Sequence, residues 1–165
     1  MQLTSPAFQN NEPIPTRFTG EGRDVSPPLE WSYAPEHCRA FALLCEDPDA
    51  TVRAGKEHPF AHWLIYNIPS RITALPEGLP AREILLLPVF ATQGRNSFGK
   101  IGYTGPMPPP GHGAHRYHFT LFALSSSIPM ASGMRREAFL LSMQGHVLES
   151  TSLECQGLSR VATAS

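Results

Sequence analysis

The chain has 165 residues, 41% of them hydrophobic, and a net charge of −1. This length predicts a single domain, residues 1–165, with a core of its own, and the near-neutral charge argues against a general nucleic-acid or membrane-surface binder. The three cysteines lack CxxC spacing, no apolar run reaches 18 residues, and no basic segment followed by an apolar one is present near residue 1. We therefore expect a cytoplasmic protein.

Short strands separated by loops are predicted for the first third of the chain. The 17 prolines are about twice the ordinary usage, which limits helix and favours strands joined by rigid loops. Residues 1–7, 16–18 and 29–31 have strand-like composition, with turn residues between them. Residues 39–46, RAFALLCE, are almost continuously apolar and predict a buried central strand.

The sequence Asp47-Pro48-Asp49-Ala50 follows this strand directly. Pro48 suits the second position of a turn, so Asp47 is held at the strand end with its side chain in a defined direction. Capping of the turn is the ordinary role of aspartate at such a place, and we favour it for Asp49. For Asp47 a role in a polar site is the alternative.

Residues 60–68, FAHWLIYNI, predict a second long strand. Strand alternation puts His62 on one face with Phe60, Leu64 and Tyr66, and Trp63 on the other. A lone histidine on an apolar face is usually a hydrogen-bonded core residue, and a pocket histidine is the alternative.

The glycine-rich segment at residues 94–105, GRNSFGKIGYTG, contains Gly94-x-x-x-x-Gly99-Lys100, which is close to a phosphate-binding loop. Ile101 stands where that motif needs Ser or Thr, and no strand-to-helix junction surrounds it. We therefore expect Asn96 and the glycines to shape the wall of a pocket instead.

Residues 105–124, GPMPPPGHGAHRYHFTLFAL, join a proline loop to a strand. Alternation places His115 and Tyr117 on one face, followed by apolar residues, while Arg116 and His118 face the other way. This pattern predicts a strand that runs from a polar pocket mouth into a hydrophobic core. A helix over residues 133–144, capped by Ser132, and a strand over residues 146–155 complete the predicted elements.

Three stretches in this order carry a family resemblance: the turn at residues 47–50, His62 near the start of a long strand, and the proline loop that leads into His115-Arg116-Tyr117. Over residues 26–157 the chain resembles the phosphatidylethanolamine-binding protein family, in its bacterial Raf-kinase-inhibitor-like branch. The resemblance implies a mainly β fold, a β-sandwich with a large central sheet, a smaller sheet and one or two flanking helices. Thr51 stands where the family usually has proline.

The resemblance also implies a small pocket that takes an anion such as phosphate, acetate or a phospholipid head group. The sequence has no local ligand spacing typical of a metal site, so no metal or cofactor is expected. Some family members inhibit kinases or proteases, and bacterial members are often homodimers, so both properties are expectations here. Met107 occupies a position that is glycine in mammalian relatives, and its bulk is expected to narrow the pocket. Carried over by position, the ligand-binding residues are Asp47, Ala50, Phe60, His62, Met107, His115 and Tyr117.

Three functions remain open on the sequence. We favour a non-enzymatic binding protein in which His62, His115 and Tyr117 donate to an anion, more strongly when the histidines are protonated and therefore at low pH. The alternative is a metal-dependent or acid–base hydrolase of a small phosphoester that uses the same histidines and Asp47, although HExxH and G-x-S-x-G signatures are absent. The third is a regulator that contacts a protein partner through its surface.

Overall fold

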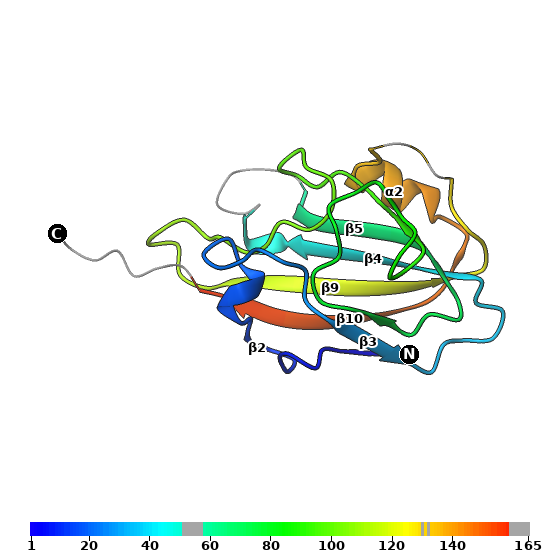
Figure 1. Ribbon diagram of the computed structural model, residues 1–165, viewed down its shortest axis with the longest axis horizontal. Coiled ribbons are helices and arrows are strands. Elements are labelled where there is room, and N and C mark those ends of the chain that lie inside the picture. Colours follow the sequence, from blue (N-terminus) through cyan, green and yellow to red (C-terminus); the bar gives the residue numbers. More distant parts are fainter. Residues whose placement is uncertain (51–57, 130, 132, 159–165) are drawn as a thin grey trace.

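The computed structural model describes residues 1–50, 58–129, 131 and 133–158, and these form a mainly β fold (Figure 1). The elements are β1 Gln2–Thr4, β2 Glu12–Pro13, the 3-10 helix η1 Thr16–Phe18, β3 Leu29–Ser32, β4 Ala40–Asp47, β5 Phe60–Pro69, β6 Ala74–Leu75, β7 Ile84–Leu85, β8 Ala91–Gln93, β9 His115–Leu124, α2 Arg136–Ser142 and β10 Val147–Gly157. Residues 48–50 are helical as well.

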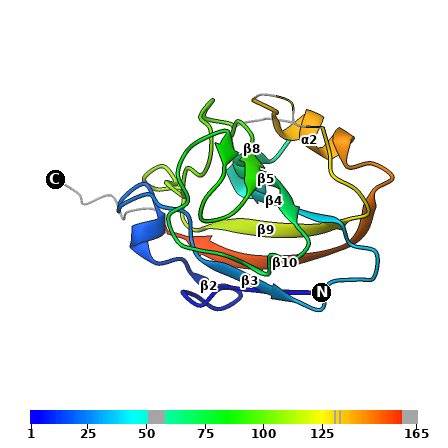
Figure 2. The same ribbon diagram turned by 45° about the vertical axis from the view of Figure 1, so that its right-hand side comes forward.

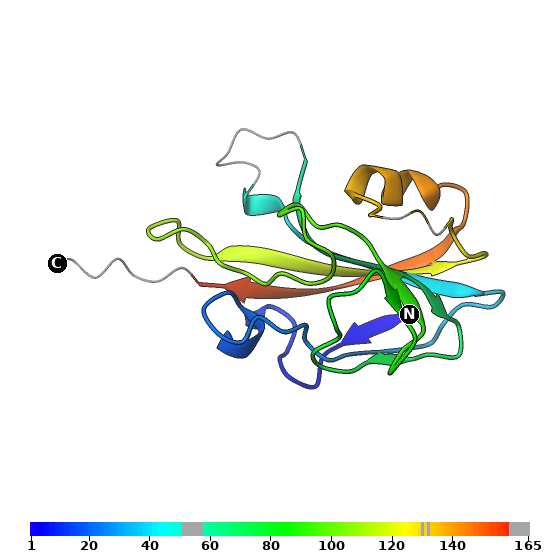
Figure 3. The ribbon, with the colours of Figure 1, turned by 45° about the horizontal axis from the view of Figure 1, so that its top comes forward.

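Two sheets and a helix form layers. The large sheet has seven strands in the order β2-β10-β9-β4-β5-β8-β7, and the small sheet has three in the order β1-β3-β6. Figure 3 shows α2 on one side of the large sheet and β1 on the other. One apolar cluster fills the space between the sheets, and a second lies between the large sheet and α2. The predicted sandwich of a large and a smaller sheet is confirmed.

The central strand β4 explains why its sequence is almost continuously apolar. Phe41, Leu43 and Cys45 belong to the cluster between the sheets, whereas Ala42 and Leu44 belong to the cluster under α2. A strand that is covered on both faces has no solvent side on which polar residues could alternate. Its place between β9 and β5, in the middle of the large sheet, confirms the prediction of a central strand.

Strand β9 follows the predicted alternation. His115, Tyr117 and Phe119 are buried on the side of the small sheet, whereas Arg116 is exposed and His118 is half-buried on the other side. On its buried side, the strand therefore has two polar residues at its start and apolar residues of the core between the sheets after them. Residues far apart in sequence reach the same end of the large sheet because β4 runs antiparallel to both β9 and β5.

A β-bulge in β5 changes which way His62 faces. Cys45 of β4 pairs with Trp63, but the next residue, Glu46, pairs with Ala61, so His62 is the extra residue on β5. A bulge of this kind breaks the alternation and redirects a side chain. The ring of His62 lies 5.2 Å from that of Tyr117, on the side of the small sheet.

The predicted grouping of His62 with Leu64 and Tyr66 is therefore wrong, because those two residues pack in the cluster under α2. Its grouping with Phe60 is right, since the two rings lie 5.2 Å apart.

Two further local predictions need correction. Residues 16–18 form a 3-10 turn and not a strand, since the N–H of Phe18 donates to the carbonyl of Pro15. This turn directs the ring of Phe18 into the core. Helix α2 begins at Arg136 and not at residue 133, because Gly133 has a φ of +61°, outside the helical region. The predicted cap Ser132 and the departure at Thr51 lie outside the described residues. No helix in the described part of the chain is both long and apolar enough to cross a membrane.

Candidate functional site

A cavity of about 210 Å³ opens where β4 ends and where β5 and β9 begin. All seven residues predicted from the sequence line it. The three remaining lining residues come from the glycine-rich loop, where a pocket wall was expected near Asn96, and from the proline loop that also carries Met107. The lining residues are Asp47, Ala50, Phe60, His62, Phe98, Met107, Pro108, Pro109, His115 and Tyr117.

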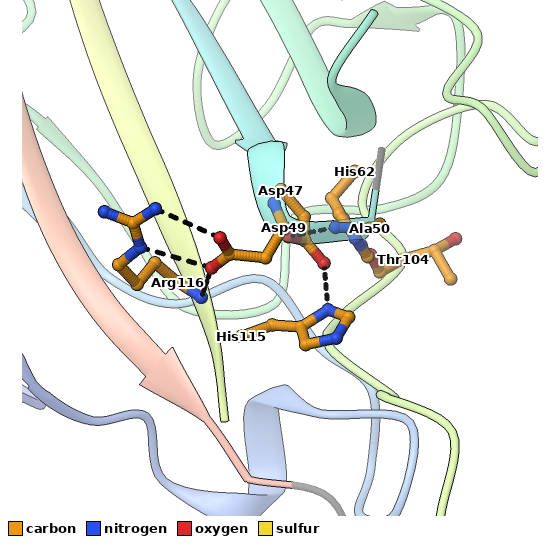
Figure 4. Close-up of polar contacts among 7 residues, drawn as sticks. All are labelled: Asp47, Asp49, Ala50, His62, Thr104, His115 and Arg116. Carbon is orange, nitrogen blue, oxygen red and sulfur yellow. Dashed lines mark hydrogen bonds and ion pairs between the residues drawn. The ribbon is translucent and has the colours of Figure 1, made fainter. Parts of the chain in front are cut away.

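The buried carboxylate of Asp47 makes two separate sets of contacts (Figure 4). Its Oδ1 accepts hydrogen bonds from the backbone N–H groups of Asp49, at 2.8 Å, and Ala50, at 3.0 Å. Its Oδ2 accepts a hydrogen bond of 2.7 Å from Nδ1 of His115. One oxygen of Asp47 thus caps the turn, as considered from the sequence, and the other contacts a second predicted pocket residue.

His115 is oriented by this carboxylate. Because a carboxylate only accepts, the hydrogen on Nδ1 is fixed, and Nε2 of the neutral ring carries a lone pair. The ring is 3% exposed, and within the described residues Nε2 is buried without a hydrogen-bond partner. A buried polar atom that lacks a partner costs about 1–3 kcal/mol, so a ligand that satisfied Nε2 would recover this energy.

His62 is fixed in the same tautomer by a different acceptor. Its Nδ1–H donates to the backbone carbonyl of Thr104 at 2.6 Å. Burial lowers the pKa of His62 below its ordinary value, although the charge of Asp47 and the bond to Thr104 act in the opposite direction. In the ligand-free protein His62 is therefore neutral at pH 7, and its Nε2 is an acceptor.

Tyr117 contributes a neutral hydroxyl group. Burial, together with the negative charge of Asp47, raises the pKa of Tyr117 well above its ordinary value. The position of this ring requires a glycine on the neighbouring strand, since a Cβ at Gly157 would lie 2.5 Å from Cε2 of Tyr117 and 2.9 Å from Cβ of Pro106.

An exposed ion pair beside the pocket joins the turn after β4 to the start of β9 (Figure 4). Oδ2 of Asp49 accepts from the backbone N–H of Arg116 at 2.8 Å and from its Nε at 3.2 Å, while Oδ1 accepts from a terminal guanidinium nitrogen at 3.0 Å. The guanidinium group lowers the pKa of Asp49. The turn-cap role favoured for Asp49 misses this contact. Nothing local to either residue indicates a partner 67 positions away.

The glycine-rich loop forms a wall of the pocket through Phe98. Asn96 organises this loop, because its Oδ1 accepts from the N–H groups of Phe98 and Lys100 and its Nδ2 donates to Gly102 and Thr104. The expectation that Asn96 shapes a wall is met in this indirect way. The loop also carries the carbonyl of Thr104 that orients His62.

The metal-dependent alternative needs at least three ligand side chains around one point. Within the described residues, no group of three or more His, Cys, Asp or Glu side chains has such an arrangement. His118, which follows His115 by three residues, lies on the opposite face of β9 as predicted, with Nδ1 3.5 Å from Glu154.

Comparison with known proteins gives the same family at three levels. The family model described as phosphatidylethanolamine-binding protein matches residues 4–156. A UPF0098 protein of Pyrococcus horikoshii is 40% identical over 145 residues, which cover 88% of this chain and 70% of the relative. A UPF0098 protein of Methanothermobacter thermautotrophicus is also 40% identical, over 148 residues that cover 90% of this chain and 92% of the relative.

Solved structures agree with the sequence relatives. A crystal structure of YbcL from E. coli, described as a new member of the mammalian PEBP family, superposes with a TM-score of 0.86 at 32% identity, covering 96% of this chain and 98% of YbcL. A putative phosphatidylethanolamine-binding protein homologue from Chlamydia trachomatis has a TM-score of 0.81 at 35% identity and covers 94% of this chain and 95% of its own.

Proposed function

The chain belongs to the phosphatidylethanolamine-binding protein family, and on that premise we propose that its pocket binds a small phosphoryl anion, free or as the head group of a phospholipid. The observation that carries the proposal is the unpartnered, buried Nε2 of His115, on a ring held in place by Asp47. A phosphoryl oxygen can accept a hydrogen bond from this nitrogen once the nitrogen carries a proton.

The tautomers of the two histidines determine the proton balance of binding. Both rings already use Nδ1–H, on Asp47 and Thr104, so in the neutral state each presents a lone pair at Nε2. A phosphoryl group therefore brings a hydrogen of its own, or the protein takes up a proton as it binds. In both cases affinity rises as the pH falls. The negative charge of Asp47 opposes an anion, so we expect a dissociation constant of about 1 mM for phosphate, which corresponds to about 4 kcal/mol.

The size of the cavity supports a head group and not a whole lipid. Sites for drug-sized ligands measure about 300–1,000 Å³, and this cavity has about 210 Å³. Met107, with 65% of its surface exposed, borders the opening. An ammonium group on the same ligand would lie near the carboxylate of Asp47, so phosphorylethanolamine should bind more tightly than phosphate.

Calorimetry with phosphate and with phosphorylethanolamine between pH 5.5 and 8.5 tests the proposal. Repeating each titration in two buffers of different ionisation enthalpy measures the protons taken up. The His62→Ala, His115→Ala double variant should lose binding, whereas His118→Ala, which changes a histidine on the opposite face of β9, should retain it. Affinity that does not vary with pH, or that survives the double variant, would contradict the histidine site.

The Asp47–His115 pair favours a second candidate function. A carboxylate that orients an imidazole is also the arrangement of a general base, which could activate water against a small phosphoester. Phosphate release from phosphorylethanolamine, measured under the calorimetry conditions, separates the two. Turnover that His115→Ala abolishes would favour the hydrolase, and binding without turnover favours the binding protein.

Inhibition of a kinase or protease through the surface is a separate proposal. A pull-down with wild type and His115→Ala tests the part that the pocket plays in it. Capture of the same kinase or protease by both proteins would assign the contact to the surface.

A further inference from the structure

One side of the large sheet ends in a short strand with exposed apolar residues around it. Strand β7 pairs with β8 and is the last strand of that sheet, and Figure 2 shows β8 and β10 at opposite sides of it. Residues 84–90, ILLLPVF, include no charged side chain. We call their exposed members the apolar edge: Ile84 (53% exposed), Leu86 (65%), Leu87 (82%), Pro88 and Phe90 (53%).

The backbone of β7 is open on the side away from β8. The N–H of Gln93, in β8, donates to the carbonyl of Glu83, directly before β7, at 2.7 Å. Because backbone direction alternates along a strand, the N–H and C=O groups of Ile84 and Leu86 point away from β8. Within the described residues, no hydrogen bond reaches these groups. The edge can therefore accept a further strand.

The side chains of the apolar edge are exposed although they lie beside a covered sheet. Leu85 pairs with Ala91, and both belong to the cluster between the sheets. The side chain of Ile84 therefore lies on the opposite face, the side of α2, and alternation places Leu86 there as well. Both residues remain more than half exposed, so α2 does not cover them. A contiguous apolar patch of this kind on a protein surface marks an interaction site.

The open backbone argues against a lipid surface as the occupant. In hydrocarbon, the N–H and C=O groups of Ile84 and Leu86 would lose their water and gain no partner. The occupant must therefore supply hydrogen-bond donors and acceptors together with apolar side chains. A β-strand of a protein supplies both.

The composition of the edge favours a second copy of this chain over the strand of a different protein. Selective recognition of a different protein generally uses complementary charges, and residues 84–90 have none. A two-fold axis through Leu85 pairs Ile84 of each copy with Leu86 of the other, so exposed apolar side chains cover one another. In this register Glu83 lies opposite Leu87, and like charges do not face each other.

We propose that two copies of the chain associate through the apolar edge, with the β7 strands of the two copies paired antiparallel about a two-fold axis. This gives a defined interface to the homodimer that was expected only by resemblance. The exposed apolar surface amounts to roughly 300–400 Å² per copy. Because standard interfaces bury about 800 Å² per partner, this one is small, and we expect a dissociation constant of about 10–100 µM.

Sedimentation equilibrium of the whole chain between about 1 and 500 µM measures the association. A species with twice the 18.1 kDa mass of one chain should increase with concentration. Leu86→Lys should weaken association at least about 100-fold, because both copies lose an apolar contact and gain a like charge near the axis. Leu141→Lys is the matched control, since this leucine on α2 is also 65% exposed, and it should associate as wild type does.

Two further measurements test the strand pairing itself. The amide hydrogens of Ile84 and Leu86 should exchange more slowly in wild type as its concentration rises, and this readout needs no variant. Ile84→Glu and Leu86→Lys should each be monomeric alone. When the two variants are mixed, the register places glutamate of one copy opposite lysine of the other, so a heterodimer should form in native mass spectrometry.

Three results would overturn the proposal. One is a monomer throughout the concentration range. Another is a dimer that survives Leu86→Lys, or that Leu141→Lys weakens equally, since either would place the interface elsewhere. The third is a wild type that stays monomeric but binds phosphatidylcholine vesicles, with Leu86→Lys abolishing this binding, because a lipid surface would then be the occupant of the apolar edge.

Discussion

Replacing Asp47 with asparagine separates the two roles of its carboxylate. Asparagine has the same shape and keeps one oxygen, which can continue to accept from the N–H groups of Asp49 and Ala50. Its NH₂ group then faces Nδ1 of His115, at the position of the present 2.7 Å hydrogen bond. Two donors cannot pair, so His115 must present a lone pair at Nδ1 and carry its hydrogen on Nε2.

The expected cost follows from replacing one charged hydrogen bond by a neutral one. Bonds to charged groups contribute about 1.5–3 kcal/mol and neutral ones about 0.5–1.5, so the free energy of unfolding should fall by about 1–1.5 kcal/mol. With a urea dependence of about 2 kcal/mol per M, the unfolding midpoint should drop by about 0.5–0.75 M. Asp47→Ala should cost more, because it also leaves two turn amides without their acceptor.

Binding changes in a way that stability alone does not show. In the variant, neutral His115 already has a hydrogen on Nε2, so a phosphoryl anion can bind there without proton uptake by this ring. The pH dependence of phosphate affinity should therefore become shallower than in wild type.

Urea unfolding at pH 7, ¹⁵N spectra of the imidazole nitrogens and calorimetry across pH measure the three effects. Asp49→Asn is the control, since it alters the exposed pair with Arg116 and leaves His115 with its partner. The reasoning is refuted if His115 keeps its hydrogen on Nδ1 in Asp47→Asn, or if the pH dependence of binding is unchanged.

Three further predictions concern other parts of the structure. Because burial lowers the pKa of His62, this histidine takes up a proton at about pH 6.5 in the unfolded chain but only at lower pH in the native protein. The free energy of unfolding should therefore fall as the pH drops below about 6.5. In urea titrations at pH 5 and 7, His62→Asn should reduce that fall. Gly157→Ala should displace the ring of Tyr117 and weaken phosphate binding in calorimetry, and an unchanged affinity would show that the ring position is not required. Phe139→Ala, in the core under α2, should lower the unfolding free energy by about 3–5 kcal/mol and leave the phosphate affinity of the folded protein unchanged. A loss of phosphate affinity in addition to the loss of unfolding free energy would show that packing under α2 affects the pocket.

Much of the fold follows from local sequence patterns. The continuous apolar run of β4 predicts a strand covered on both faces, and the alternation from His115 to Leu121 predicts which side of β9 is buried. These features depend on the alternation of side chains along a strand and on the burial of apolar residues, and both can be inferred from the order of residues in the chain. The seven pocket residues, however, were identified from the family resemblance and not from the alternation of side chains along the strands.

The chemistry of the site depends on contacts that sequence patterns do not encode. The bulge that directs His62 toward Tyr117 arises from the register between β4 and β5, and alternation alone predicts the wrong neighbours. The tautomer of His62 is set by a carbonyl 42 residues away, and Asp49 binds Arg116 across 67 residues. Periodicity and turn composition are local properties of the chain. The donor or acceptor that a buried ring nitrogen meets is determined only when distant strands come into register, because each backbone group then has one fixed direction.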